Sequence, residues 1–163
     1  MVFGLGAAPR PPVPPAGSGP ESLKVLVCCD GSEHSVRAVD LAAALLSPAV
    51  TVRLLTVASK GFDKYEGPWG PLSDEEERDK ELKSFVDRAF GVPTERLQKA
   101  GIQPETIVLL GNPAEQILDH VHEWQPDMVV VGRYGTTGLR KMMMGSVSDT
   151  LVKSAGVPVL VVP

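Results

Sequence analysis

A short pattern of glycines near the end of the chain could hold a phosphate group. It runs Gly-Arg-Tyr-Gly at 132–135, then nine residues, then Gly-Ser at 145–146, and an apolar run at 128–131 leads into it. Glycines let the backbone approach an anion closely, and a helix that starts after such a loop offers free N–H groups and the positive end of its dipole. We call this pattern, from Gly132 to Ser146, the glycine frame.

The glycine frame differs from the two best-known phosphate loops. A Walker A loop closes with Gly-Lys-Ser or Gly-Lys-Thr, whereas Gly145 is followed directly by Ser146. A dinucleotide loop has the spacing Gly-x-Gly-x-x-Gly, whereas the glycines here stand at 132, 135 and 138. Three basic side chains within the frame could balance phosphate charge: Arg133, Arg140 and Lys141. The residues alone leave two interpretations open, a phosphate site of unspecified type and a basic surface loop without a ligand.

The chain offers little that would make such a site catalytic. His120 and His122 stand two residues apart on a predicted helix, so they do not share a face, and His34 is distant from both in the sequence. No Ser-His-Asp order and no cluster of metal ligands stands out. Asp30 could orient Mg²⁺ or a water molecule, but one aspartate is weak support for hydrolysis.

The two cysteines, Cys28 and Cys29, are neighbours within an apolar run. Neighbours on a strand point to opposite faces, so these two are not placed to bridge each other. We expect two reduced, buried thiols in a cytoplasmic protein.

Short apolar runs alternate with amphipathic stretches from Lys24 onward, which predicts alternating strands and helices. The predicted strands are 24–29, 51–57, 105–110, 127–131 and 157–162. The predicted helices follow the Asp30 turn, a Ser73 capping box, an Asn112 cap with Pro113 at its first position, and Ser146, which we expect to cap a helix reaching about Ser154. Gly91 and Pro93 are expected to interrupt or kink the second helix, and the loop at 58–72 is long enough to cover a site.

This alternation predicts a doubly wound α/β fold, with a five-stranded parallel sheet and helices on both faces. Strands that are apolar on both faces suit such a covered parallel sheet. In these sheets ligands bind beyond the carboxyl ends of the strands, where the strand order reverses. Asp30 and Gly132 each follow a predicted strand, so both are expected at that edge.

Composition limits the number of domains and the kind of partner. The 163 residues fit one domain, 23–163, preceded by a proline-rich segment, 1–22, that we expect to be a disordered tail. A net charge of −4, with both signs dispersed, argues against nucleic acid as a partner. No apolar run is long enough to span a membrane, and we expect no signal peptide at residues 1–10.

Four blocks of the sequence together resemble the universal stress protein family. They are the glycine frame with the terminal strand 157–162, the first strand and turn at 25–32, the segment 111–117, and the strand 127–132. The blocks stand in the order typical of the family, and the resemblance covers about residues 23–162. It implies the fold of the adenine nucleotide alpha hydrolases and membership of a subgroup that binds ATP.

The resemblance also implies which residues would contact the nucleotide. Asp30 would contact it directly, while Cys28 and Val57 would border the adenine. The residues that would wrap the ribose and the phosphates are Gly132, Arg133, Gly135, Gly145, Ser146 and Val147, with Ser148 as a further phosphate contact. Cys28 departs from the small or proline-like residue expected at its position.

We therefore predict a regulatory module whose ATP occupancy, with or without Mg²⁺, controls its conformation and its partners. The resemblance implies that one partner is a second copy, paired through the terminal strand Val157–Val162. Two alternatives stay open: a slow ATPase or phosphotransferase, and an interaction dimer that binds no nucleotide. A flavodoxin-like electron carrier is more distant, because an aromatic share of 5% offers few rings to stack on a flavin. The sequence does not decide between ATP, AMP and a cyclic nucleotide.

Overall fold

The computed structural model describes residues 22–58, 66–67, 70–71, 75–135 and 145–163. In chain order its elements are β1 (Lys24–Cys28), α1 (Glu33–Leu45), β2 (Thr51–Ala58), β3 (Glu66–Gly67), β4 (Gly70–Pro71), α2 (Glu75–Lys99), β5 (Glu105–Leu110), α3 (Pro113–Trp124), β6 (Met128–Gly132), α4 (Ser146–Ser154) and β7 (Val159–Val162). The tail predicted for residues 1–22 lies outside the described residues, apart from Ser22.

The main sheet has five strands in the order β5-β2-β1-β6-β7, and every neighbouring pair is parallel. The prediction of a doubly wound, five-stranded parallel sheet is confirmed. From β1 the chain moves outward to β2 and β5, and then crosses to β6 on the other side of β1. The strand order therefore reverses between β1 and β6, which is where such folds bind ligands.

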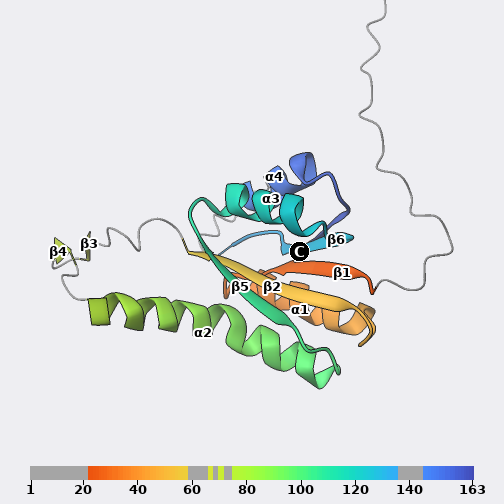
Figure 1. Cartoon of the computed structure of the whole chain (residues 1–163), viewed down its shortest axis with the longest axis horizontal. Coiled ribbons are helices and arrows are strands. Elements are labelled where there is room, and N and C mark those ends of the chain that lie inside the picture. Colours follow the sequence, from red (N-terminus) through yellow and green to blue (C-terminus); the bar gives the residue numbers. More distant parts are fainter. Residues whose placement is uncertain (1–21, 59–65, 68–69, 72–74, 136–144) are drawn as a thin grey trace, which may run out of the picture.

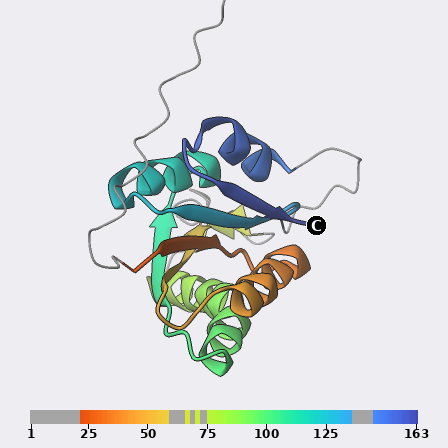
Figure 2. The same ribbon diagram turned by 90° about the vertical axis from the view of Figure 1, so that its right-hand side faces the viewer.

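Helices cover both faces of the sheet (Figure 1), and a view at right angles shows the same layers (Figure 2). Side chains alternate along β1: Val25 and Val27 pack on the side of α1 and α2, whereas Leu26 packs on the side of α3 and α4. Cys28 and Cys29 fall in these two different clusters, both buried and unbridged, as predicted.

Local capping residues start two of the helices. The Ser32 side chain accepts a hydrogen bond from the Ser35 N–H at the start of α1. The Asn112 side-chain oxygen Oδ1 accepts from the Ala114 N–H at 3.0 Å, with Pro113 at the first position of α3, as predicted. The Ser73 capping box lies outside the described residues.

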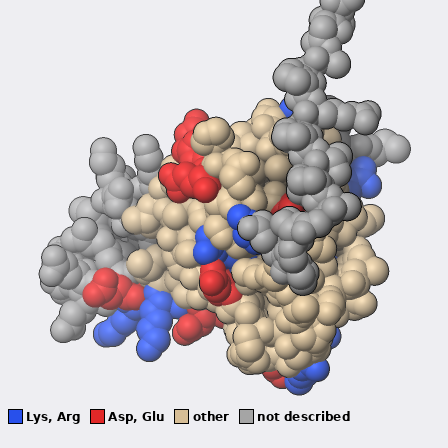
Figure 3. Space-filling model, turned by 45° about the vertical axis from the view of Figure 1, so that its right-hand side comes forward, with Lys and Arg blue, Asp and Glu red and all other residues tan. Residues whose placement is uncertain are grey.

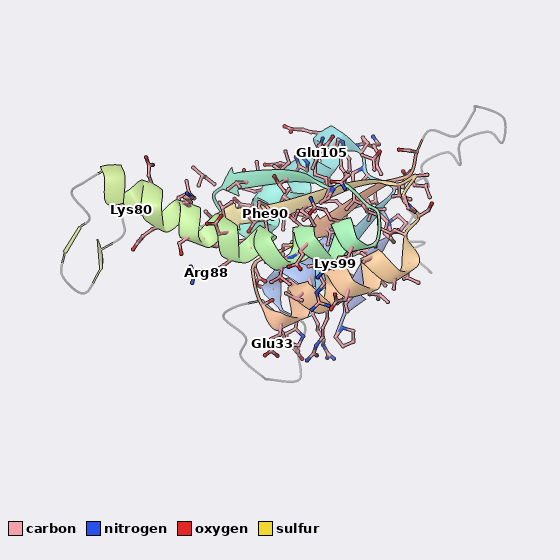
Figure 4. The ribbon with its side chains drawn as sticks, turned by 90° about the horizontal axis from the view of Figure 1, so that it is seen from below. Glu33, Lys80, Arg88, Phe90, Lys99 and Glu105 are labelled. Atoms are coloured by element: carbon pink, nitrogen blue, oxygen red, sulfur yellow. The ribbon has the colours of Figure 1, made fainter. Side chains whose placement is uncertain are left out.

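The long helix α2 lies beside α1 on one face of the sheet, with Phe90 near its middle and Lys99 at its end (Figure 4). It runs unbroken through Gly91 and Pro93, so of the two predicted outcomes, an interruption and a kink, the interruption is wrong. A proline removes only one backbone hydrogen bond and can kink a helix without ending it. The ribbon of α2 bends partway along its length in Figure 1.

The predicted strands differ from the observed ones mainly at their ends. The terminal strand begins at Val159 rather than Val157, and β6 extends through Gly132. The predicted loop at 58–72 contains the two-residue strands β3 and β4, which pair antiparallel. Among the described residues, no helix is both long and apolar enough to cross a bilayer. Acidic and basic side chains lie interspersed on the face drawn in Figure 3.

Candidate adenine-nucleotide site

The turn after β1 holds Asp30 at the point where the strand order reverses. The Ser32 N–H donates to Asp30 Oδ1 at 3.0 Å. Between them Gly31 has φ +78°, in the left-handed region that favours glycine. A Cβ on Gly31 would also lie 3.2 Å from the Arg88 carbonyl oxygen, so the backbone of α2 packs against this turn. The turn that carries the Asp30 carboxylate therefore lies between the start of α1 and the backbone of α2.

The end of β6 lies directly against the first turn of α1. A Cβ on Gly132 would lie 2.8 Å from the His34 carbonyl carbon and 2.9 Å from the Ser35 nitrogen. Those are backbone atoms, so a side chain at this position would force the backbone of β6 or α1 to shift. This close packing brings the loop after β6 beside the loop after β1.

The two loops meet at Gly135 and Asp30. A Cβ on Gly135 would lie 2.7 Å from Asp30 Oδ2. One residue earlier, the Tyr134 carbonyl oxygen accepts a hydrogen bond from the Ser32 hydroxyl at 3.4 Å. Asp30 and the start of the glycine frame, which were expected at the same edge of the sheet, therefore lie next to each other.

The two ends of the glycine frame are held together at Arg133. The Gly145 N–H donates to the Arg133 carbonyl oxygen at 2.9 Å, and the Ser148 hydroxyl lies 3.0 Å from the same oxygen. A Cβ on Gly145 would approach that oxygen to 2.9 Å. The two described ends of the frame, at 132–135 and 145–146, are therefore held side by side by these hydrogen bonds. Arg140 and Lys141 lie outside the described residues.

Gly145, and not Ser146, is the N-cap of α4, so the predicted Ser146 cap is wrong. The chain needs glycine at the cap because its backbone presses against Arg133, and Ser146 becomes the first helical residue with an exposed side chain. No side chain caps this helix start within the described residues. Its first N–H groups therefore retain the capacity to bind an anion.

Apolar residues adjoin the site on the α3 and α4 side of the sheet. Cys28 ends β1 there with 7% of its surface exposed, and Val57 and Val147 pack against the same cluster. Burial, with a smaller contribution from the Asp30 charge, raises the pKa of the Cys28 thiol to about 12. The Cys28 thiol is therefore buried and uncharged near neutral pH.

The family follows from a comparison with known proteins. The model of the universal stress protein family matches residues 22–163. This chain belongs to the universal stress protein family. Universal stress protein YxiE of Bacillus subtilis is 32% identical over 144 residues, which cover 85% of this chain and 97% of YxiE.

Solved structures agree with the family and the fold. MJ0577 of Methanocaldococcus jannaschii superposes on this universal stress protein with a TM-score of 0.69 at 26% identity, covering 86% of this chain and 94% of MJ0577. A universal stress protein in complex with cAMP has a TM-score of 0.61 at 22% identity, covering 86% and 96%. A family protein of Arabidopsis thaliana with AMP bound has a TM-score of 0.58 at 20% identity, covering 86% and 90%. Homologues with this fold therefore bind adenine nucleotides.

Two residues beside the site of this universal stress protein were missed by sequence reasoning. The rings of His34 and Tyr134 meet edge to face at 5.1 Å, and the Arg133 guanidinium lies 5.3 Å from the Tyr134 ring. His34 Nδ1 is buried and has no hydrogen-bond partner among the described residues. These side chains come from α1 and from the frame, so no spacing in the sequence could pair them. Among the described residues, no group of three or more His, Cys, Asp or Glu could hold a metal ion.

Proposed function

We propose that this universal stress protein binds ATP at the edge formed by β1, β6 and the start of α4, and that occupancy controls its conformation and partners. The observation that carries the proposal is the approach of Gly135 to Asp30, where a Cβ would lie 2.7 Å from Oδ2. This approach places the Asp30 carboxylate next to the glycine backbone at 135, at the point where the strand order of the doubly wound sheet reverses. A nucleotide needs both features, a polar group for its sugar or base and close backbone for its phosphates.

Charge divides the proposed site into two parts. The Asp30 carboxylate would repel phosphates, so it suits the ribose hydroxyls or the adenine amino group, beside Cys28 and Val57. The phosphates then belong at the uncapped start of α4, where backbone N–H groups and the helix dipole favour anions. The residues proposed to surround ribose and phosphates are Gly132, Arg133, Gly135, Gly145, Ser146 and Val147, and Mg²⁺ would accompany the phosphates.

The homologues bound to cAMP and AMP support an adenine nucleotide as the ligand class. We favour ATP because the helix start and Arg133 together suit more than one phosphate. The decisive experiment is mass spectrometry of an acid extract of the purified protein, followed by calorimetry with ATP, AMP, cAMP and GTP. An extract without adenine nucleotide, together with no heat of ATP binding, would leave the interaction dimer as the better interpretation.

The role of Asp30 is tested by Asp30→Asn, with the exposed Asp119→Asn on α3 as a matched control. A hydrogen bond to a charged group contributes about 1.5–3 kcal/mol, so Asp30→Asn should weaken ATP binding at least about tenfold. Asp119→Asn should leave it unchanged. Steady ADP release with Mg²⁺ that Asp30→Ala abolishes would instead indicate a slow ATPase.

We also propose that two copies pair through the terminal strand Val157–Val162. β7 lies at the edge of the sheet, carries no charged side chain, and leaves Val159, Leu160 and Val161 only half-buried. Open apolar edges of this kind favour pairing with another strand. Val161→Lys should convert a dimer into a monomer in sedimentation experiments, whereas a monomeric parent protein would contradict the proposal.

A further inference from the structure

The strand β5 forms the edge of the main sheet opposite to β7, and one of its faces is exposed. Ile107 and Leu109 point to the side of α3 and α4 and pack against the apolar cluster there. The alternate residues Thr106, Val108 and Leu110 therefore point to the side of α1 and α2. On that side α2 packs on the neighbouring strand β2. All three residues are exposed, Val108 to 37% and Leu110 to 53%.

The backbone groups of the same three residues face the open edge. The Gly111 N–H donates to the Ala58 carbonyl oxygen of β2 at 2.9 Å. Backbone groups alternate in direction along a strand, so the odd-numbered residues of β5 bond to β2. The N–H and carbonyl groups of Thr106, Val108 and Leu110 point away from the sheet and are available to another strand.

This edge lacks the features that usually prevent pairing. Natural sheets commonly protect an open edge with a charged side chain, a proline or a bulge. None of these occurs from Thr106 to Leu110, and the register with β2 is regular along the whole strand. The one charged residue of β5, Glu105 (Figure 4), lies on the other face, where Arg53 donates to its carboxylate at 2.6 and 2.9 Å.

The order of residues in β5 favours a second copy of the same strand as the partner. With a two-fold axis at Val108, antiparallel pairing places Val108 opposite the partner's Val108, and Thr106 opposite the partner's Leu110. Every outward backbone group then meets an outward group, as in a hydrogen-bonded antiparallel pair. Glu105 falls opposite the partner's Gly111, so no like charges face each other. One register is thus compatible with the hydrogen bonds, the apolar side chains and the charge.

We propose that β5 is a second pairing edge, at which two copies of this protein join antiparallel about Val108. The contact uses no residue of the nucleotide site and does not depend on pairing at β7. It covers few apolar side chains, chiefly Val108 and Leu110, so it forms at higher protein concentration than a dimer through β7. Where both edges pair, copies alternate between the two contacts and assemble beyond a dimer.

The test starts from Val161→Lys, which removes pairing at β7 and leaves β5 as the open edge. In sedimentation experiments this protein should be a monomer when dilute and a dimer when concentrated. Adding Val108→Lys places like charges at the axis, and should raise the dimer dissociation constant at least about tenfold. Adding Val152→Lys instead is the matched control, because Val152 is an exposed valine on α4, which packs on β7 at the opposite edge. It should leave the constant unchanged.

A charge exchange tests the position of the axis. In the same starting protein, Val108→Lys and Val108→Glu should each associate weakly, whereas an equal mixture of the two should dimerise, since opposite charges then meet at the axis. A mixture that associates no better than either variant alone would overturn the proposed pairing. So would a Val161→Lys protein that stays monomeric at every soluble concentration. ATP binding should be the same in all these variants, so its loss would count against the nucleotide site and not against the β5 contact.

Amide hydrogen exchange in the unaltered protein provides a test without substitutions. The N–H groups of Ile107 and Leu109 should be protected at every protein concentration, because they bond to β2. Those of Thr106, Val108 and Leu110 should exchange fast in dilute protein and several-fold more slowly in concentrated protein. Exchange of these three groups at a rate independent of concentration would reject pairing through β5.

Discussion

The two ends of the main sheet are both rich in polar residues, yet they differ in what those residues contact. At the carboxyl ends of β1 and β6, glycines keep side chains out, and the start of α4 has no side-chain cap in the described structure. At the amino ends of β1, β2 and β5, charged side chains are bound to one another. As far as the structure describes them, the charged groups at the amino end have partners, whereas the start of α4 at the carboxyl end has no side-chain cap.

The amino end is organised around Arg53 and Trp124. The Arg53 guanidinium donates to Glu105 Oε2 at 2.6 and 2.9 Å, lies 3.2 Å from His120 Nε2, and stacks 4.2 Å from the centre of the Trp124 ring. Lys24 Nζ donates to the Trp124 carbonyl oxygen at 2.7 Å. These contacts fasten the end of α3 to three strands, so this end acts as a structural clasp.

The comparison teaches that residue type does not distinguish a binding site from a clasp. Arginine, histidine and tryptophan at the amino end would look more like a ligand site than glycines do. What differs is whether the hydrogen-bonding groups already have partners inside the protein. The glycines at the carboxyl end let backbone and carboxylate approach closely, and the start of α4 beside them has no side-chain cap among the described residues.

The largest expected effect tests whether Cys28 is a neutral wall of the site. Its pKa of about 12 stands three above the ordinary 9.0, so at pH 8 its thiolate fraction, and its alkylation by iodoacetamide, should fall about a thousandfold relative to the unfolded chain. Mass spectrometry locates the label, and the same protein in guanidinium is the control. Rapid labelling of Cys28 in the folded protein would mean that this end of β1 is open and ionisable.

The next effect tests why Gly132 is glycine. In Gly132→Ala the new Cβ would press on the backbone of His34 and Ser35, and such overpacking costs about 1–3 kcal/mol. Urea unfolding should show that loss, together with weaker ATP binding. Gly91→Ala is the control, because among the described residues nothing outside its own helical turn lies within 4 Å of the added Cβ, and alanine favours the helix. Equal stability for the two variants would contradict the close packing of β6 on α1.

Much of the fold was predictable because parallel strands buried on both faces produce continuous apolar runs. The run at 105–110 also matched β5 at both ends, although this edge strand is only partly buried. The terminal strand was predicted two residues too long, since Val157 is apolar but pairing with β6 begins only at Val159. The apolar character of a residue predicts that it is buried. Where a strand begins depends instead on where the neighbouring strand can pair with it.

The site was predictable in part, for a related reason. The spacing of Gly132, Gly135 and Gly145 could be read from the sequence, but the atoms that demand glycine there belong to residues distant in the chain, such as Asp30 and His34. The role of Ser148 and the clasp around Trp124 also depend on long-range contacts. Local patterns show what a residue could do, and only the fold shows which partner has already engaged it.

A smaller effect tests the clasp. Arg53→Ala should destabilise the fold by about 1–2 kcal/mol, because the side chain is only 18% exposed and loses charged hydrogen bonds and its stacking on Trp124. Affinity for ATP should not change. Arg37→Ala, which removes an exposed ion pair with Glu33 at 3.9 Å, should have almost no effect on stability. A loss of ATP affinity in Arg53→Ala would contradict the claim that the amino end has a structural role and takes no part in nucleotide binding.

The smallest expected effect is a loss of stability on acidification, which should arise at the amino end through His120. Burial, and then the positive charge of Arg53, lower the pKa of His120 below its ordinary 6.5, while Glu123 opposes the shift. Glu105 and Lys24 are the other charged groups of the clasp around it. The unfolded chain therefore takes up a proton more readily than the folded protein does. Stability is full above pH 6.5 and declines as the pH falls from there toward the lowered pKa.

Urea unfolding between pH 8 and pH 5 measures this decline, with His120→Gln as the reference that cannot titrate. The unaltered protein should lose more stability on acidification than His120→Gln does, and the contributions of the other titrating groups cancel in the difference. ATP affinity of the two proteins should follow the same pH profile, because the clasp and the site lie at opposite ends of the strands. Parallel stability curves would remove His120 from the clasp, whereas a difference in ATP affinity would show that the clasp and the site act on each other.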